Sequence, residues 1–235
     1  MSFHPVSAIL DSNGSTYITS APNIYQIAKL ELERLKNRDI FKEYKEIYFI
    51  AHSMGGLVTK NLLKQLNRRE DLPLLRQVKG VVFLGTPSQG ASATTLAKWI
   101  SFNPQVGAME PAHLNQWLQE LEDEWDNLMK GRGESQYPRA LCAYEIRSYL
   151  PGYIVVPREA AVSNCDTFTG LDLDHSDLAV PRMREKDPYD WAMGAILRTS
   201  KVSNNFDDIK VLFECDSHLS KTAYDVGSSE GVGCW

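Results

Sequence analysis

The sequence lacks several features that would each indicate a particular class of protein. Of its 235 residues only four are cysteines, and they have no spacing typical of a metal site. The net charge is −5, which argues against a polyanion or an acidic membrane surface as the main partner. No basic stripe with aromatic residues and no Gly-x-Gly-x-x-Gly motif occurs, so we expect neither nucleic acid nor a dinucleotide as ligand.

Two further absences concern the compartment. No apolar run approaches the roughly 18 residues that a membrane span needs, and the N-terminus has no signal-peptide pattern. These absences predict a cytoplasmic protein without an integral membrane segment. In that compartment we expect the cysteines to be free thiols rather than a disulfide framework; they are Cys142, Cys165, Cys215 and Cys234. The sequence leaves the oligomeric state open.

Short apolar runs alternate with helical patterns along most of the chain. The runs are continuous rather than alternating, which is typical of parallel strands covered by helices on both faces. They begin at Ile47 and then span Lys79–Leu84, Ala140–Ile146 and Thr167–Leu173; Val6–Leu10 is a further candidate strand, and a helix with Asn23 as N-cap is expected over 24–38. The pattern predicts an α/β fold with a mostly parallel, doubly wound sheet.

The domain organisation follows from the same pattern. Residues 1–200 are predicted to form one α/β domain, and residues 201–235, where serine and glycine increase, are interpreted as an appendage or tail. Within the domain, residues 86–138 lack a strand signal and contain an amphipathic helix. Two interpretations stay open for that helix: packing on the core, or a lid over a site, because insertions after a strand's carboxyl end lie where α/β proteins bind ligands.

One stretch carries a chemical motif. In "IYFIAHSMGGLVTKNLL", residues 47–63, a strand breaks into a turn of small residues and a helix follows, with Ser53 at the centre of the turn. This is the pattern of a nucleophile elbow, Gly-x-Ser-x-Gly, in which Ala51 replaces the first glycine and Gly55 is the second. We therefore predict Ser53 as a nucleophile and the backbone N–H of Met54 as a donor to the developing oxyanion.

A serine nucleophile requires a histidine base, which in this fold comes last in the chain. His175 directly follows the fourth predicted strand and is the predicted base. His4 and His113 lie in the wrong segments, and His218 lies in the tail. His52 adjoins the serine, but we expect its side chain to point away from it, toward packing or a loop.

The third member of a triad is a carboxylate that orients the histidine. It should come from the loop after the preceding strand, where Glu159 and Glu145 are the candidates. We favour Glu159, because it lies farther beyond the strand where a loop can fold back. Glu145 remains the alternative, and Asp174 is disfavoured because it adjoins His175 along the backbone.

With these residues in place, the chain resembles the lipase-like serine esterase branch of the α/β-hydrolase superfamily, which includes GPI inositol-deacylase-like proteins. The resemblance is carried by "IYFIAHSMGGLVTKNLL", "VVFLGTPSQGA", "IVVPREAA" and "LDLDHSDLAVP", over roughly residues 20–197. It implies ester hydrolysis by Ser53 with His175 as base. It also implies a carboxylate near the "VVPREAA" segment, in agreement with the choice of Glu159.

The chain departs from the family at three places. Ser88 stands where the family has histidine, and Tyr153 and Ile154 precede the "VVP" run where related lipases often carry aspartate. The family strand that ends in His-Gly and supplies a second oxyanion donor has no counterpart, because "VSAIL" resembles the next strand; a lost donor costs about 100- to 1000-fold in rate. Either the loop 11–19 or the tail substitutes for this strand, or the chain is an N-terminally shortened hydrolase.

The expected function is hydrolysis of a carboxylic ester or lipid by a serine esterase or lipase, without cofactor or metal. The alternative is a catalytically impaired, hydrolase-like domain that binds a lipid or a protein. A third idea is a metal site in "CDTFTGLDLDHSD", although acidic residues in such an arrangement more often form a solvated rim; they are Asp166, Asp172, Asp174 and Asp177.

Overall fold

The computed structural model describes residues 24–88, 111–133, 137–148, 152–180 and 186–200, with the side chains of 111–115 excepted, and the backbone of five short strands outside these ranges. The main sheet contains β3 (Glu46–His52), β4 (Val78–Leu84), β5 (Arg139–Glu145), β6 (Thr167–Leu171) and β7 (Ile209–Glu214), in the order β6-β5-β4-β3-β7. All four pairings in it are parallel. The predicted α/β fold with a parallel sheet is therefore confirmed.

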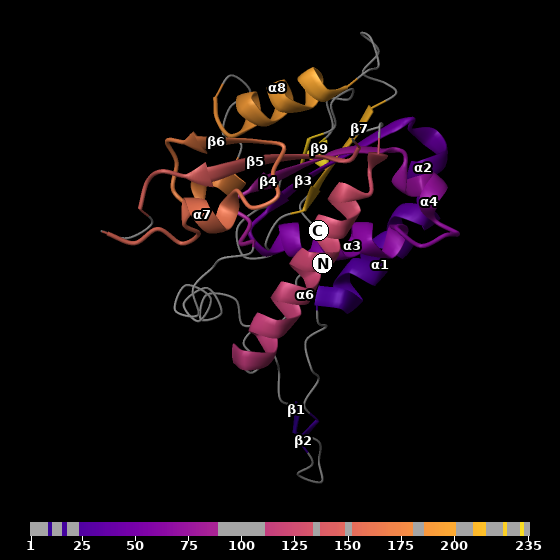
Figure 1. Ribbon diagram of the computed structural model, residues 1–235, viewed down its shortest axis with the longest axis horizontal. Helices are drawn as coiled ribbons and strands as arrows, with labels where there is room; N and C mark the ends of the chain where they lie inside the picture. The colour runs from indigo at the N-terminus through magenta and orange to yellow at the C-terminus, as the bar shows by residue number, and fades with distance from the viewer. Residues whose placement is uncertain are drawn as a thin grey trace.

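Helices cover both faces of this sheet (Figure 1). On one face lies α8 (Tyr189–Thr199), and on the other lie α1 (Ile24–Asn37), α3 (Met54–Leu66) and α6 (Pro111–Lys130). Shorter helices are α2 (Ile40–Glu43), α4 (Leu72–Leu75), α7 (Arg158–Ala161) and the 3₁₀ turn η2 (Asp177–Ala179). Successive residues of β3 alternate between two hydrophobic clusters: Phe49 packs in the one that includes α1 and α3, and Ile50 in the one that includes α8.

Strand β7 comes from the segment that the sequence assigns to a tail. It pairs in parallel with β3. The register runs from Ile209 opposite Glu46 to Glu214 opposite Ala51. By the resemblance, the missing family strand would lie between "VSAIL" and the serine strand, directly beside the serine strand. Part of the tail thus occupies a place directly beside the serine strand, which is one of the two substitutions the sequence left open.

The candidate strand at Val6–Leu10 takes a different place from the one expected. Strand β1 (Ile9–Leu10) pairs antiparallel with β2 (Thr16–Tyr17) in a sheet of two strands, separate from the main sheet. The strands β8 (Ala223–Tyr224) and β9 (Gly231–Val232) form a second such pair. The two described residues of "VSAIL", Ile9 and Leu10, therefore do not join the parallel sheet as the resemblance implies, since they pair with β2 instead.

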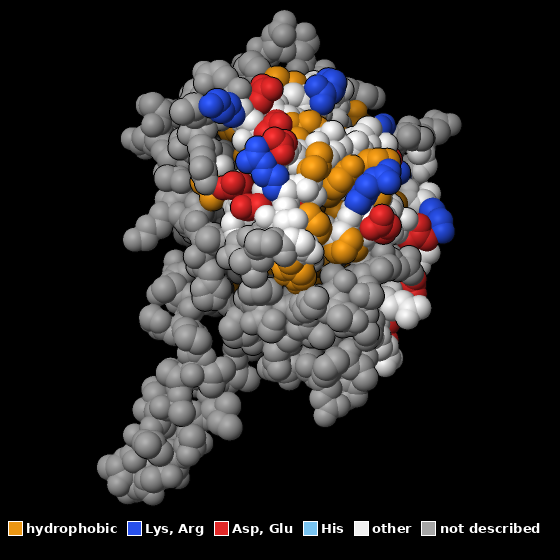
Figure 2. Space-filling view, turned by 90° about the vertical axis from the view of Figure 1, so that its left-hand side faces the viewer, with side chains coloured by type: hydrophobic (Ala, Val, Ile, Leu, Met, Phe, Trp, Pro, Cys, Tyr) orange, Lys and Arg blue, Asp and Glu red, His pale blue; other side chains and the backbone are white. Residues whose placement is uncertain are grey.

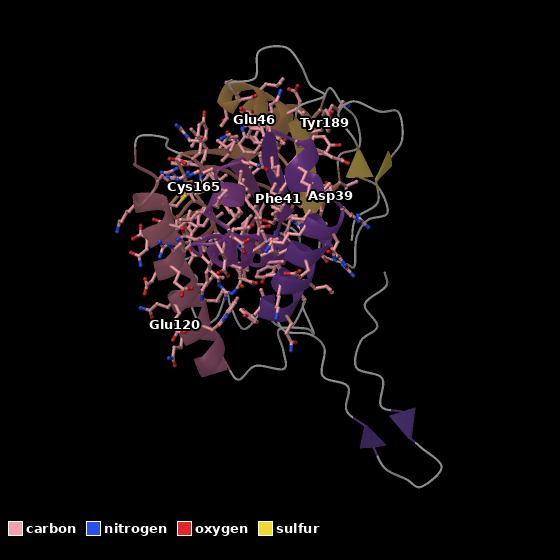
Figure 3. The ribbon with its side chains drawn as sticks, turned by 90° about the vertical axis from the view of Figure 1, so that its right-hand side faces the viewer. Asp39, Phe41, Glu46, Glu120, Cys165 and Tyr189 are labelled. Carbon is pink, nitrogen blue, oxygen red and sulfur yellow. A yellow bond between two sulfur atoms is a disulfide. The ribbon has the colours of Figure 1, made fainter. Side chains whose placement is uncertain are left out.

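Helix α6 packs against the body of the domain through its apolar face. Leu121, Trp125, Leu128 and Met129 are buried, and the Trp125 ring meets the Phe83 ring edge-on with centroids 5.7 Å apart. Glu120 and Asp123 remain exposed, and Figure 3 shows Glu120 at the outer part of α6, whereas Glu122 is buried. For the described side chains of α6, the structure supports the interpretation as a helix packed on the core.

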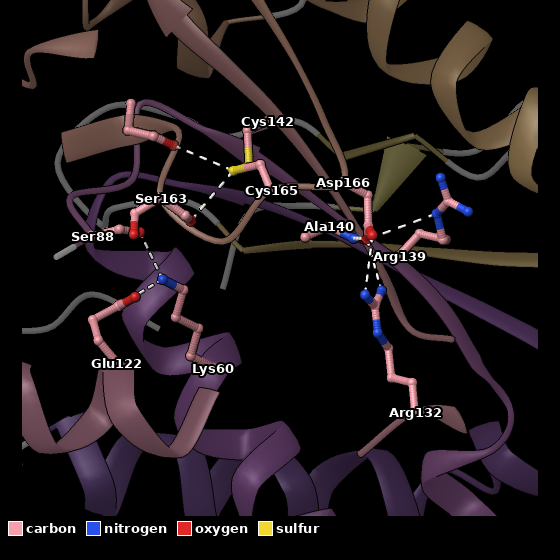
Figure 4. Close-up of a disulfide and its surroundings, with 11 residues drawn as sticks. Lys60, Ser88, Glu122, Arg132, Arg139, Ala140, Cys142, Ser163, Cys165 and Asp166 are labelled. Atoms are coloured by element: carbon pink, nitrogen blue, oxygen red, sulfur yellow. Dashed lines mark hydrogen bonds and ion pairs between the residues drawn. A yellow bond between two sulfur atoms is a disulfide. The ribbon is translucent and has the colours of Figure 1, made fainter. Parts of the chain in front are cut away.

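Cysteine chemistry differs from the expectation of free thiols. Cys142 on β5 and Cys165, shortly before β6, form a disulfide (Figure 4). The prediction was wrong for this pair because it rested on the absent signal pattern, whereas the pairing depends on neighbouring strands bringing the two sulfurs together. Cys215 and Cys234 lie outside the described residues. No helix within the described ranges combines the length and apolarity required to cross a membrane.

Candidate active site

Ser53 sits in a strained turn between β3 and α3. Its backbone has φ 51° and ψ −121°, a combination that residues with a side chain rarely adopt. The Ser53 N–H donates to the carbonyl of Leu84 at 2.9 Å, which ties the turn to the end of β4. The predicted strand, turn and helix are present, and the serine is only 1% exposed.

Two glycines make room for this arrangement. A Cβ on Gly56 would lie 2.1 Å from Thr86 Oγ1, so only glycine lets the first turn of α3 approach the loop after β4. Gly85 has φ +56°, and a Cβ there would lie 3.1 Å from both Glu145 Oε2 and His175 Nδ1. Gly85 therefore leaves space for the contact between this carboxylate and this imidazole.

His175 lies in the turn between β6 and η2, where it meets both Ser53 and Glu145. Its Nε2 is 3.0 Å from Ser53 Oγ, and its Nδ1 is 3.3 Å from Glu145 Oε2. The other carboxylate oxygen, Glu145 Oε1, accepts a hydrogen bond of 2.7 Å from the Val156 N–H. The Glu145 side chain is fully buried, whereas 12% of the His175 side chain is exposed.

The carboxylate beside His175 is thus Glu145, and not the favoured Glu159. Glu159 lies exposed in the short helix α7, while Glu145 is the last residue of β5. Sequence reasoning favoured a carboxylate farther out in the loop, but the carboxyl end of β5 already reaches His175. The "VVPREAA" segment does lie at the carboxylate, because its Val156 holds Glu145 through the backbone.

Met54, the predicted oxyanion donor, is the first residue of α3. The N–H groups of a first helical turn have no acceptor within the helix and point along the positive end of its dipole.

Strand β7 ends at Glu214. Its partner there is Ala51 of β3, which lies two residues before Ser53. Strand β7 therefore extends to the same end of the sheet as the turn that carries Ser53.

His52, directly before the serine, has its hydrogen-bond partner in the turn that carries His175. Its Nε2 lies 2.8 Å from the backbone carbonyl oxygen of His175. The two imidazole rings are tilted by 47° with centroids 4.7 Å apart. Burial, followed by the charge of His175, lowers the pKa of His52 to about 3, and the hydrogen bond to the His175 carbonyl only partly opposes this.

A second buried cluster lies between α3 and α6 and was not foreseen from the sequence. Lys60 on α3 forms an ion pair with Glu122 on α6 and donates a 2.7 Å hydrogen bond to Ser88 Oγ (Figure 4). Both charged side chains are at most 2% exposed. Burial lowers the pKa of Lys60, and Glu122 opposes that shift. Ser88 is thus held by Lys60.

The acidic residues suggested as a metal site are occupied by other contacts. Asp166 pairs with Arg132, Asp172 pairs with Arg147, and Asp174 accepts a hydrogen bond from the Asp177 N–H. The described part of the chain contains no group of three or more histidine, cysteine, aspartate or glutamate residues arranged to hold a metal ion.

The side of the domain that carries β6 and α7 is seen in Figure 2. Hydrophobic side chains lie there among acidic and basic ones. Phe168 on β6 is 49% exposed, and the Arg158 guanidinium lies 5.4 Å from the centre of its ring. The most exposed apolar ring of this edge strand is therefore partly covered by a cation.

Comparisons with known proteins place the chain near one group of relatives. No family model matches the chain. Protein SERAC1 of Danio rerio is 24% identical over 165 residues, which are 67% of this chain and 24% of that protein. Protein SERAC1 of Homo sapiens is 21% identical over 159 residues, or 62% of this chain and 23% of that protein. The match thus spans about a quarter of the relatives' length.

A solved structure with a similar arrangement is an extracellular alpha/beta-hydrolase from a Paenibacillus species. The two chains share 12% sequence identity and superpose with a TM-score of 0.39. The similarity covers 77% of this chain and 81% of the other. The fold class itself rests on the parallel sheet order and on the helices that cover both of its faces.

Proposed function

We propose that this chain is a serine hydrolase that cleaves carboxylic esters through an acyl-enzyme on Ser53. The observation that carries the proposal is the line of contacts from Ser53 Oγ to His175 Nε2 at 3.0 Å and from His175 Nδ1 to Glu145 Oε2 at 3.3 Å. These are the contacts that a nucleophile, a base and an orienting acid need, and they occur on a strained strand-to-helix turn.

In the acylation step, Ser53 Oγ attacks the ester carbonyl while His175 Nε2 takes the serine proton. The imidazolium then returns this proton to the alcohol that leaves. Glu145 accepts a hydrogen bond from His175 Nδ1–H, which selects the tautomer whose Nε2 lone pair faces the serine. The Val156 N–H, at 2.7 Å from Glu145, stabilises the ionised carboxylate throughout.

The negative charge on the carbonyl oxygen develops near the N-terminus of α3. The Met54 N–H belongs to that terminus and is the proposed donor. A water molecule then attacks the acyl-enzyme, with His175 acting first as base and then as acid toward Ser53.

Hydrolysis of p-nitrophenyl esters from acetate to octanoate tests this function. We expect turnover by the wild type, and we expect Ser53→Ala and His175→Ala to reduce it to the background rate while the thermal unfolding transition is retained. Equal hydrolysis by wild type and Ser53→Ala would contradict the proposal. A folded wild type with no hydrolysis of any ester would favour the alternative of a lipid- or protein-binding domain.

A further inference from the structure

His52 is a buried titratable residue that the proposed chemistry does not use. It is the last residue of β3, is 3% exposed and immediately precedes the nucleophile. Its Nε2 is 2.8 Å from the carbonyl oxygen of His175. A carbonyl oxygen can only accept a hydrogen bond, so His52 Nε2 must carry the proton. The contact therefore assigns His52 as a donor to the backbone of the proposed base.

The protonation state of His52 suits a fixed donor. With the proton on Nε2, the Nδ1 atom of the neutral ring holds a lone pair, and it has no hydrogen-bond partner among the described residues. Burial is the main cause that keeps the pKa of His52 near 3. The ring is thus neutral near neutral pH, and the hydrogen bond does not change with pH in that range.

The backbone at His175 needs such a fixed partner. His175 lies in a turn after β6, outside the ladder of the sheet, whereas His52 lies in a central strand paired on both sides. The bond links positions 123 residues apart in the chain. Because His52 and Ser53 are consecutive, the end of β3 and the turn directly after it position both the nucleophile and the backbone of the base.

We propose that His52 is a positioning residue that sets the distance between Ser53 Oγ and His175 Nε2 by holding the His175 carbonyl. This deepens the proposed hydrolase function and rests on it. His52 neither touches the substrate nor transfers a proton. Its loss would let the turn that carries His175 shift, and a misplacement of about 1 Å in a reacting group can cost about 100-fold in rate.

Two substitutions separate this role from simple packing. His52→Gln keeps an amide N–H donor near the place of Nε2, and His52→Leu keeps apolar volume without a donor. With a fluorophosphonate probe, we expect the rate of labelling at Ser53 to fall about 10- to 100-fold in His52→Leu. We expect His52→Gln to recover most of that rate, and the melting temperatures of both variants serve as the stability reference.

Equal labelling of His52→Leu and wild type would overturn the proposal, and so would equally slow labelling of both variants with parallel losses of stability. A folded wild type that fails to label would instead overturn the hydrolase function. In that case the ring nitrogen signals of ¹⁵N-histidine-labelled protein decide the positioning role. The proposal requires the His52 signals of a neutral ring protonated on Nε2. It also requires that the His175 signals shift more in His52→Leu than in His52→Gln. Any other pattern overturns it.

Discussion

Two buried glutamates, Glu145 and Glu122, differ in the kind of base that each one faces. Both residues are 2% exposed. Glu145 faces His175, a partly exposed base at the carboxyl end of the sheet, and both of its oxygens accept hydrogen bonds. Glu122 faces Lys60 inside the helical layer, and its Oε2 has no hydrogen-bond partner among the described residues. Equal burial therefore accompanies two arrangements: a carboxylate beside the proposed base at the edge of the sheet, and a connection between two helices.

The largest expected effect is on the glutamate of the proposed triad. Glu145→Gln removes the charge that stabilises the imidazolium and can select the wrong tautomer, so we expect ester turnover to fall about 1000-fold or more. Glu159→Gln, on the exposed surface of α7, is the matched control and should change turnover less than about twofold. Steady-state hydrolysis by the two variants, compared at equal folded concentration, measures the difference. Comparable losses in both variants would return Glu159 to consideration.

The next effect concerns stability and should leave the chemistry intact. Lys60→Met leaves Glu122 buried without its cation, which we expect to lower the free energy of unfolding by about 3–5 kcal/mol. The double variant Lys60→Met/Glu122→Leu should recover most of this loss, because no unpaired charge remains. Urea unfolding measures both. If Lys60→Met were as stable as wild type but inactive, Lys60 would belong to the reacting site instead.

The disulfide between Cys142 and Cys165 is attached to the strand that carries Glu145. It joins β5, which carries Glu145, to the loop before β6, which leads to His175. For a sequence separation of 23 residues, loop-closure entropy predicts a loss of about 3 kcal/mol when the bond is absent. Urea unfolding of Cys165→Ser in comparison with the oxidised wild type checks this value. A reductant should destabilise the wild type but leave the variant unchanged, and sensitivity of the variant would contradict the assignment.

A smaller effect is expected from pH at the ion pair before β6. Burial raises the pKa of Asp166, but hydrogen bonds from Arg132 and the Ala140 N–H outweigh this and bring the pKa below the ordinary 3.8. The native state thus binds fewer protons here than the unfolded state. The stabilisation is complete above the ordinary pKa and is lost as pH falls through the lowered one. Wild type should therefore exceed Asp166→Asn in unfolding free energy at pH 6, with the gap narrowing as the pH falls below 3.8.

The smallest effect is expected at an exposed ion pair. Arg147 and Asp172 contact each other at the surface, where 59% and 74% of their side chains are exposed. Solvent screening leaves such pairs with little net value. Arg147→Ala should therefore leave the melting temperature unchanged within error, and a clear decrease would show that the contrast between buried and exposed pairs is overstated.

The sequence predicted those parts of the molecule that depend on local pattern. Continuous apolar runs identified β3 to β6, and the small residues around Ser53 identified the elbow. His175 was predicted because the histidine comes last in the chain order of this fold, and His175 directly follows the fourth predicted strand. Each of these inferences uses only neighbouring residues and the order of the strands.

The remaining features depend on contacts between distant segments. The position of Glu145 beside His175 requires the register of β5 against β6, which a single sequence does not contain. The place of β7 next to β3, the pairing of Cys142 with Cys165, and the bond from Lys60 to Glu122 are equally long-range. One local signal did favour Glu145 as the partner of His175. Glu145 is the last residue of a central strand, and so is His52, the other residue that contacts His175.

The measurement that tests the central proposal most directly is reaction of the wild type with a fluorophosphonate probe, followed by peptide mapping of the adduct. This probe requires an activated serine and no knowledge of the natural ester. We expect a single adduct on Ser53 that Ser53→Ala and His175→Ala abolish. A folded protein without an adduct, or with an adduct that persists in Ser53→Ala, would contradict a Ser53 hydrolase.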